Sequence, residues 1–322
     1  MNLSLVSILI PAYNAELYIA ETLESAIAQT WGNIEIIVVD DGSRDDTLAI
    51  AKRYETKGIK VIAQGQNRGQ TVALNRCLAE AQGDYIQYLD ADDILEPQKI
   101  GIQVNRLLNE PQGTLAIAPW ARFYENNLLT AKFKPNRDWK DYDNPIDWLI
   151  DGWTDYGTMP PTSWLYPRDV IDETGPWHES LTLNNDMEYF TRAVIASKKL
   201  VFCTEARWYY RSGHPSLSGQ RSNQALWSVY EVIRLSTGRL LAIENSDRTR
   251  YACACYWQLF VFMAYPQALD LIKYAEKQIH DLGGCDLVPE GGLMFKVIRQ
   301  ILGWRIAMRL QKLYYKYRQL NR

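Results

Sequence analysis

The first 120 residues alternate short apolar runs with stretches of helical periodicity, and this alternation restricts the possible folds more than any other feature of the chain. Short apolar runs bounded by polar residues are typical of buried strands, and the amphipathic stretches between them are typical of helices that cover a parallel sheet. Five strands are predicted, at residues 6–10, 35–39, 60–63, 85–89 and 115–118. The pattern therefore predicts an α/β fold in which a parallel sheet is flanked by helices.

The helices between these strands have predictable starts. Asn14 is expected to cap the first helix, and Ser43 with Asp46 is expected to open the second in the manner of a capping box. A third helix is predicted over 70–81. The order βαβαβαβ follows, which is typical of a parallel sheet.

After about residue 120 the regular alternation ends. The density of Trp, Tyr, Pro and Gly between Asp138 and Pro176 predicts a loop-rich, aromatic binding region. A helix over 185–197, a strand over 200–204 and a polar loop over 211–220 are predicted next. The chain then reads as helices over 224–242, 247–263, 266–282 and 292–319. The predicted organisation is a sheet domain in two parts, 1–110 and 111–221, with a helical region over 222–322.

Composition and missing motifs exclude several classes of protein. Lys and Arg total 35 against 38 Asp and Glu, a net charge of −3, which disfavours nucleic acid as a partner. The five cysteines have neither CxxC pairs nor zinc-finger spacing, which is typical of reduced thiols in the cytoplasm. Pro11 and Asn14 break the first apolar run, so no signal peptide is predicted, and no stretch reaches the roughly 18 to 20 apolar residues of a membrane span. Without GxSxG, HExxH, Walker A or GxGxxG, serine hydrolases, zincins, P-loop enzymes and dinucleotide oxidoreductases have no support.

Polar side chains follow four successive predicted strands, at the edge where open parallel sheets bind their ligands. The four segments are Pro11-Ala12-Tyr13-Asn14, Asp40-Asp41-Gly42-Ser43, Gln66-Asn67-Arg68-Gly69 and Asp90-Ala91-Asp92-Asp93. They supply a ring for stacking, acceptors for base and ribose, and charge that can act on phosphates. The pattern predicts a nucleotide site at this edge.

The acidic segment after the fourth strand is the most specific of these. Asp90 and Asp92 are separated by one residue at a strand end. They can bind a hard divalent cation such as Mn or Mg, which in turn binds pyrophosphate oxygens. The alternative is that these acids cap the helix that starts near Pro97. Asp40 and Asp41 have a similar alternative, a turn formed with Gly42.

The combined motifs resemble those of the family 2 glycosyltransferases. The resemblance covers about two thirds of the chain and rests on VSILIPAYN at 6–14, SAIAQTW at 25–31, IIVVDDGSRDDT at 36–47, NRGQTVALN at 67–75 and GDYIQYLDADD at 83–93, and more weakly on GPWHESLTLNNDMEYFTRA at 175–193 and YYRSGHPSLS at 209–218. It implies a GT-A fold with a Rossmann-like nucleotide-binding sheet, a divalent cation at a DXD motif, and inverting transfer from a nucleotide-diphosphate sugar.

The resemblance also implies roles for matching donor-side positions. Tyr13 and Asp41 would contact the base with help from Arg68, Asp90 would approach the ribose, and Asp92 would hold the metal. The full donor set comprises Pro11, Tyr13, Asp40, Asp41, Asn67, Arg68, Asp90 and Arg211. Arg211 and His214 lie in a segment that matches a lid over the diphosphate, where His214 would touch phosphate or metal. The alternative for His214 is a solvated loop histidine.

On the acceptor side, the family's ED motif falls on Asn185-Asp186, so the resemblance implies that Asp186 is the general base. Its alternative role is the N-cap of the following helix. Glu188 and Arg192 have the alternative of an i, i+4 ion pair. His178, Glu179 and Trp164 are the acceptor candidates, Trp164 as one of an aromatic group whose alternative is a core role: Trp139, Trp148, Trp153, Tyr156, Trp164 and Trp177.

The last 31 residues, 292–322, combine basic and apolar residues without any acidic one. Such a basic amphipathic helix can lie in the interface of an anionic membrane, and the alternative is a helix packed on the catalytic domain or on a dimer partner. The prediction is a cytoplasmic protein, with peripheral contact at the inner face of the plasma membrane and homo-oligomerisation both left open.

The predicted function is metal-dependent, inverting transfer of a hexose-type sugar from a nucleotide-diphosphate sugar to a hydroxyl of a saccharide or lipid-linked acceptor, in the synthesis of cell-surface polysaccharide or glycoconjugate. UDP is favoured by family frequency. The alternatives are a sugar-phosphate nucleotidyltransferase, whose usual Gly-rich loop after the first strand is missing here, and a non-catalytic nucleotide-sugar binding or scaffold protein.

Overall fold

The structure, a computed structural model of the chain, describes residues 3–124, 126–155, 157, 159–213 and 222–320, with side chains of the last helix described through Tyr314. The chain divides into two compact units, Met1–Arg221 and Ser222–Arg322. The first contains the sheets, and the second is helical.

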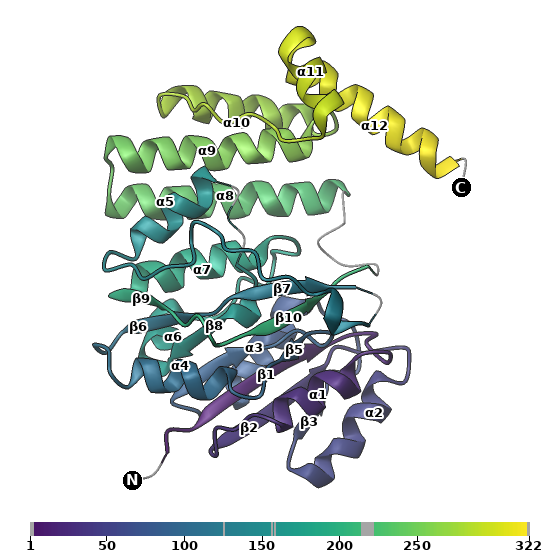
Figure 1. Cartoon of the computed structure of the whole chain (residues 1–322), viewed down its shortest axis with the longest axis vertical. Coiled ribbons are helices and arrows are strands. Elements are labelled where there is room, and N and C mark those ends of the chain that lie inside the picture. Colours follow the sequence, from purple (N-terminus) through teal and green to yellow (C-terminus); the bar gives the residue numbers. More distant parts are fainter. Residues whose placement is uncertain (1–2, 125, 156, 158, 214–221, 321–322) are drawn as a thin grey trace. The chain divides into compact units, whose positions relative to one another are not determined.

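A seven-stranded sheet forms the centre of the first unit (Figure 1). Its spatial order is β3-β2-β1-β4-β8-β6-β9. The bounds are β1 Val6–Ala12, β2 Ile34–Asp40, β3 Lys60–Ala63, β4 Tyr85–Tyr88, β6 Thr114–Ile117, β8 Trp164–Pro167 and β9 Lys199–Phe202. Strands β3, β2, β1 and β4 are parallel, and β8 is antiparallel to both β4 and β6. The predicted α/β fold is confirmed.

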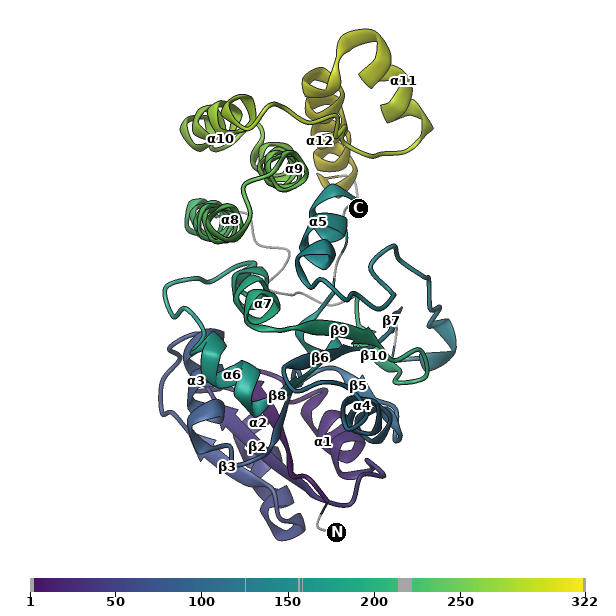
Figure 2. The ribbon, with the colours of Figure 1, turned by 90° about the vertical axis from the view of Figure 1, so that its left-hand side faces the viewer.

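Helices cover both faces of this sheet, as Figure 2 shows: α1 (Ile19–Ile27) and α4 (Lys99–Leu107) on one, α3 (Gln70–Glu80) and α6 (Arg168–Thr174) on the other. Successive strand side chains point to opposite faces, so Val6, Ile8 and Ile10 share one face and pack with the apolar sides of α1 and α4. Burial of both faces explains why the central strands are rich in apolar residues. The remaining short elements are α2 (Thr47–Arg53) and the 3₁₀ turns at Tyr54–Lys57, Leu128–Thr130 and Pro161–Ser163.

A second sheet of three short strands has the order β5-β10-β7. Its strands are β5 (Ile94–Leu95), β10 (Trp208–Arg211) and β7 (Trp120–Phe123). Because β5 directly follows the acidic turn and pairs with β10, this sheet brings the end of β10 next to Asp92 and Asp93.

Two predicted helix caps are wrong. Helix α1 begins at Ile19 and α2 at Thr47, each four residues or more beyond the predicted caps Asn14 and Ser43. The two side chains instead join the loops after β1 and β2: Ser43 Oγ accepts from Asn14 N at 3.0 Å, and Asn14 Oδ1 accepts from Arg44 N at 2.9 Å. A side-chain oxygen that bonds to the neighbouring loop is no longer available to cap the following helix. The oxygens of Asn14 and Ser43 are used in this way between the two loops, and so neither caps a helix.

The predicted loop-rich region between residues 138 and 176 is largely regular and buried. It contains α5 (Ile146–Thr154), β8 and α6, and the rings of Trp148, Trp153 and Trp164 are at most 2% exposed. Trp139 stacks on Phe202, and Tyr156 lies outside the described residues. The density of aromatic residues reflects a core between the sheet, α5 and α7 (Asn185–Ala196), because large rings contribute most when they are fully buried.

The second unit contains α8 (Asn223–Ile243), α9 (Asp247–Ala264), α10 (Leu269–Asp281), α11 (Leu293–Leu302) and α12 (Trp304–Leu320). Helix α9 packs between α8 and α10 (Figure 1). The single helix predicted over 292–319 is two helices, because Gly303 has a φ of +81° that breaks the helix. Within the described ranges, no helix has the length and apolarity needed to cross a membrane.

All five cysteines are free, and Cys285 is the only one that is partly exposed. The Cys255 thiol donates a hydrogen bond to the Cys285 sulfur and lowers the pKa of Cys285 to about 7. Because the thiolate is the reactive form, we expect iodoacetamide to alkylate Cys285 alone in the folded protein, at a rate that rises through about pH 7. Peptide mass mapping measures this, with Cys285→Ser as the unreactive control. Alkylation of a second cysteine in the folded protein would contradict the buried positions of the other four.

Candidate active site

The acidic turn after β4 places its three carboxylates in different surroundings. Asp93 is 1% exposed, and its carboxylate accepts hydrogen bonds from Arg211 N at 3.0 Å and from Thr162 Oγ1 at 3.4 Å. Asp90 and Asp92 are partly exposed at the carboxyl end of the strand. Asp93 therefore anchors the turn, and Asp90 and Asp92 are the members that a ligand can reach.

Asp186 faces this turn from the start of α7. It is the second residue of the helix, whose N-cap is Asn184, so the alternative that Asp186 is the N-cap is wrong. Burial raises the pKa of Asp186 to about 6. Burial first, and then the negative charges of Asp92 and Asp186, raise the pKa of Asp90 to about 7. Asp90 thus lies close enough to Asp92 and to Asp186 of α7 to be repelled by both.

The carboxylate oxygens available at this edge suit a hard cation. Carboxylate oxygens are the ligands that Mg²⁺ and Mn²⁺ prefer, and the mutual repulsion at Asp90 is the charge imbalance that a cation would relieve. No three His, Cys, Asp or Glu side chains of the described part of the chain form a metal-binding group by themselves. Protein carboxylates would therefore supply only some of the ligands of such an ion.

The adjacent carboxylates at the end of β2 have separate tasks. Asp41 accepts from Arg68 N and Gly69 N at 2.8 Å each and from Gln64 Nε2 at 3.0 Å, so both of its oxygens are used to hold the loop after β3. Asp40 Oδ2 accepts from Gly42 N and Ser43 N at 3.2 and 3.1 Å. Asp40 Oδ1 is buried and has no partner among the residues that the structure describes.

The other donor-side candidates lie beside these carboxylates. Tyr13, Asn67 and Arg68 are exposed on the loops after β1 and β3, whereas Pro11 is a buried residue of β1. Asn14 and Asp41 connect the three loops, so the structure brings the residues that follow β1, β2 and β3 to one edge, as the sequence pattern predicted.

Gly42 sets how closely these loops approach. It has a φ of +70°, and a Cβ there would lie 2.5 Å from the carbonyl carbon of Gln66 and 2.6 Å from Asn67 N. We expect Gly42→Ala to lower the free energy of unfolding by at least about 2 kcal/mol and to weaken ligand binding at this edge, because backbone atoms must move. Urea unfolding measures the change. Gly65→Ala is the matched control, since Gly65 has a φ of +76° but open space around it, and equal losses in the two variants would contradict the close approach.

Arg211, predicted to bind donor phosphate, is used inside the protein. Its side chain is 2% exposed, with Nε donating to Asp92 O at 2.8 Å and its terminal nitrogens donating to Asn126 Oδ1 and Glu21 Oε2. The guanidinium also lies over the rings of Phe123 and Tyr18. Three of its N–H groups are thus used inside the protein, and the bond to Asp92 O connects Arg211 to the acidic turn. His214 lies outside the described residues.

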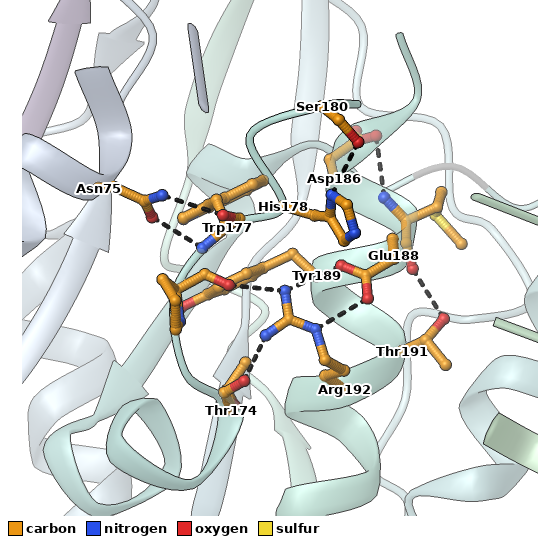
Figure 3. Close-up of polar contacts among 12 residues, drawn as sticks. Asn75, Thr174, Trp177, His178, Ser180, Asp186, Glu188, Tyr189, Thr191 and Arg192 are labelled. Atoms are coloured by element: carbon orange, nitrogen blue, oxygen red, sulfur yellow. Dashed lines mark hydrogen bonds and ion pairs between the residues drawn. The ribbon is translucent and has the colours of Figure 1, made fainter. Parts of the chain in front are cut away.

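On the acceptor side, the segment before α7 is fastened to α3. The side-chain amide of Asn75 accepts from Trp177 N at 2.7 Å and donates to Trp177 O at 2.9 Å (Figure 3). The same amide donates to Glu179 Oε1 at 3.1 Å. His178 is exposed, and its Nδ1 lies 3.1 Å from Ser180 Oγ. The structure therefore holds His178 and Glu179 at the surface beside α7.

Trp164 is a correction to the predicted acceptor set. It is 0% exposed, and its ring centroid lies 4.9 Å from those of both Trp148 and Phe190. A ring enclosed by other rings has no face left for a sugar. Trp164 is a core residue.

Helix α7 is held by contacts that spacing alone reveals only in part. The i, i+4 pair of Glu188 and Arg192 is present at 2.8 Å, and Arg192 also donates to the carbonyls of Thr174 and Pro176 (Figure 3). The rings of Trp177 and Tyr189 stack with centroids 4.0 Å apart. The sequence showed the ion pair, but no local signal pointed to Asn75 or Tyr189, because their partners are distant in the chain or depend on the packing of α7.

A mainly parallel sheet has polar loops and an acidic turn at its strand ends, and a carboxylate from a separate helix lies near that turn. These features define an α/β protein with a candidate ligand site at the carboxyl ends of the strands. Residues 7–175 match the model of the family described as Glycosyl transferase family 2. The chain belongs to this family, as its motifs led us to expect.

Several curated relatives are also described as glycosyltransferases. An uncharacterised glycosyltransferase of Haemophilus influenzae is 40% identical over 110 residues, which are 34% of this chain and 44% of that protein. Uncharacterised glycosyltransferases of Rickettsia bellii and Rickettsia felis are 31% and 29% identical over 75% and 88% of this chain, and over 35% and 48% of their own lengths. The chain thus spans less than half of the length of these relatives.

Solved structures show the same fold. Staphylococcus aureus TarS superposes with a TM-score of 0.63 at 19% identity, over 86% of this chain and 53% of TarS. TarS 1–349 in complex with UDP superposes with a TM-score of 0.63 at 20% identity, over 86% of this chain and 88% of that one. The GT-A fold with a helical C-terminal region is confirmed.

Proposed function

We propose that this chain is a metal-dependent, inverting glycosyltransferase that moves a sugar from a nucleotide-diphosphate sugar to a hydroxyl of a saccharide or lipid-linked acceptor. The observation that carries the proposal is the position of Asp186, which lies near Asp90 on a separate helix and has a pKa raised by burial to about 6. A carboxylate placed in this way can accept a proton near neutral pH.

The donor nucleotide would bind at the strand ends. Tyr13 offers an exposed ring for the base, and Asp40 Oδ1 offers a buried acceptor that still needs a donor, such as a base N–H. The family resemblance assigned the base contact to Asp41, but both oxygens of Asp41 already hold the loop after β3. Asp40 is therefore the better candidate for that contact, and Asp90 keeps its proposed place at the ribose.

Asp92, with Asp90 beside it, would hold Mn²⁺ or Mg²⁺ together with diphosphate oxygens. A bound cation would neutralise the charge that develops on the leaving diphosphate. Arg211 would act on this ion only indirectly, by fixing the turn that carries Asp92.

Asp186 would take the proton from the acceptor hydroxyl while its oxygen attacks the anomeric carbon and the bond to the diphosphate breaks. One general base and one displacement invert the anomeric centre, since the acceptor enters opposite the leaving group. His178 and Glu179, fixed at the surface beside α7, would contact the acceptor. UDP is the favoured nucleotide, because the structurally similar TarS 1–349 was crystallised with UDP and with UDP-GlcNAc.

A thermal-shift screen of UDP, GDP, CDP and dTDP, with and without Mn²⁺, tests the donor site. A nucleotide at 100 times its dissociation constant stabilises a protein by about 2.7 kcal/mol, so we expect one of them to raise the melting temperature by about 5 to 10 °C in the presence of metal. Asp92→Asn should remove the shift. The matched control, Asp172→Asn on the exposed surface of α6, should keep it.

The outcomes separate the proposal from its alternatives. A metal-dependent shift without any transfer of sugar to added acceptors would favour the nucleotide-sugar binding protein. No shift from any nucleotide at millimolar concentration, with folded protein, would contradict the donor site itself.

A further inference from the structure

We propose that α11 and α12 form a docking surface for an anionic phospholipid membrane. The proposal goes beyond the glycosyltransferase function, and its test needs neither donor nor acceptor. The surface, called the tail surface here, consists of exposed apolar side chains on both helices: Leu293, Met294, Val297, Ile301, Leu302, Ile306, Leu310, Leu313 and Tyr314.

These side chains are arranged as stripes rather than scattered. Leu293, Val297 and Ile301 recur every four residues on α11, and Ile306, Leu310 and Leu313 recur at four and three residues on α12. Such spacing places each set on one side of its helix. Their exposed fractions run from 43% to 82%, in a segment where a soluble helix would present polar groups. Contiguous apolar exposure of this kind marks an interaction surface.

The exposure is not a sign of unfolded helices, because the opposite sides are packed. Phe295 on α11 and Ala307 on α12 are buried. Trp304 packs on Phe262 and Tyr265, and Lys312 Nζ donates to Tyr265 O. The helices are thus held to the second unit by one side and leave the apolar stripes on another.

Charge decides which partner suits this surface. Residues 291–322 include no Asp or Glu but eight Lys or Arg: Lys296, Arg299, Arg305, Arg309, Lys312, Lys316, Arg318 and Arg322. Of the cations with described side chains, Arg305 pairs with Glu276 of α10, Arg299 donates to Pro289 O and Lys312 donates to Tyr265 O. Lys296 and Arg309 are exposed on the same two helices, and the guanidinium of Arg309 lies 5.4 Å from the ring centroid of Tyr265. A second copy of the same surface would bring like charges together. An anionic bilayer offers the opposite charge and an apolar interior at the same depth.

Co-sedimentation of the full chain with lipid vesicles tests the proposal. We expect binding to phosphatidylcholine vesicles that contain 30% phosphatidylglycerol, and little binding to phosphatidylcholine alone. Each basic residue near an anionic surface strengthens binding about 5-fold, so Lys296→Gln with Arg309→Gln should weaken it about 30-fold. Leu310→Gln with Leu313→Gln should weaken it at least about 10-fold by removing apolar contact.

Matched variants away from the tail surface control for general changes. Lys132→Gln with Lys134→Gln removes two exposed charges, and Leu129→Gln removes a leucine that is 92% exposed; both should bind vesicles like the parent chain. Circular dichroism verifies that the tail variants keep their helices. Absence of vesicle binding, equal binding to both lipid mixtures, or unchanged binding of the tail variants would overturn the proposal. So would a dimer, seen by sedimentation velocity, that the leucine double variant separates into monomers.

Discussion

Asp186→Asn is expected to lower kcat by about 100- to 10,000-fold, the range that a general base contributes. The amide keeps the size of the side chain but cannot accept a proton from an acceptor hydroxyl. Asp186 is the second residue of α7, and its Oδ1 accepts from Met187 N at 3.0 Å. An amide oxygen can accept the same bond, so the substitution should leave the fold intact. Steady-state transfer of labelled sugar to acceptor, with the nucleotide found in the thermal-shift screen, measures the loss.

The pH dependence provides an independent check on the same residue. Burial raises the pKa of Asp186 to about 6, and a base must be deprotonated to act. We therefore expect kcat/KM of the parent protein to rise with pH up to about 6 and then to level off. The residual activity of Asp186→Asn should lack this limb. The nucleotide thermal shift should survive in this variant, and a variant that retained full activity would remove Asp186 from the mechanism.

Arg211→Met is expected to lower the free energy of unfolding of the first unit by about 3 kcal/mol and to abolish metal-dependent nucleotide binding. The side chain is 2% exposed and donates to Asp92 O, to Asn126 and to Glu21. Its loss removes a buried cation with these three bonds and releases the turn that carries Asp92. Urea unfolding and the thermal-shift screen measure the two effects. Arg211→Lys should show the same two losses, in the free energy of unfolding and in nucleotide binding, since one ammonium group cannot reach three acceptors in separate directions.

Glu21→Gln is the matched control for the ion pair. Glu21 is 52% exposed, so this substitution should cost less than about 1 kcal/mol, as is usual for a partly solvated pair. If Arg211 bound phosphate instead of positioning the turn, Arg211→Met would reduce nucleotide affinity and leave the stability of the ligand-free protein unchanged. That result would contradict the assignment made from its contacts.

Most of the sheet could be predicted because its strands are local signals. The runs at 6–10, 35–39 and 60–63 are mostly apolar, and such runs need no information about their partners to be recognised as strands of a parallel sheet. β8 escaped prediction because Trp164–Pro167 is short and lies among Trp, Tyr and Pro, where burial and a loop look alike in sequence. The same ambiguity led to the incorrect acceptor role for Trp164.

The candidate site divides along similar lines. Which residue types gather at the strand ends was predictable, since the carboxyl ends of parallel strands meet at one edge. The contacts of each residue there could not be predicted. Asp40 and Asp41 are neighbours in sequence, yet Asp40 Oδ1 has no partner among the described residues, whereas both oxygens of Asp41 bond to the loop after β3. The prediction that Arg211 lies in a phosphate lid has the same origin, because the sequence does not show whether an arginine side chain will be exposed or buried.

The sequence by itself determined the parallel sheet, the acidic turn at its edge, the family, and the basic, acid-free tail of residues 292–322. These depend on periodicity, on residue type and on order along the chain, all of which are local. Only the tertiary structure decided that Asp186 faces Asp90, that Arg211 braces Asp92, that Trp164 is enclosed, and that Gly303 splits the last helix into two. Burial and hydrogen-bond partners depend on residues that come into contact only after the chain has folded. These contacts raise the pKa of Asp186, use the N–H groups of Arg211 and enclose the ring of Trp164.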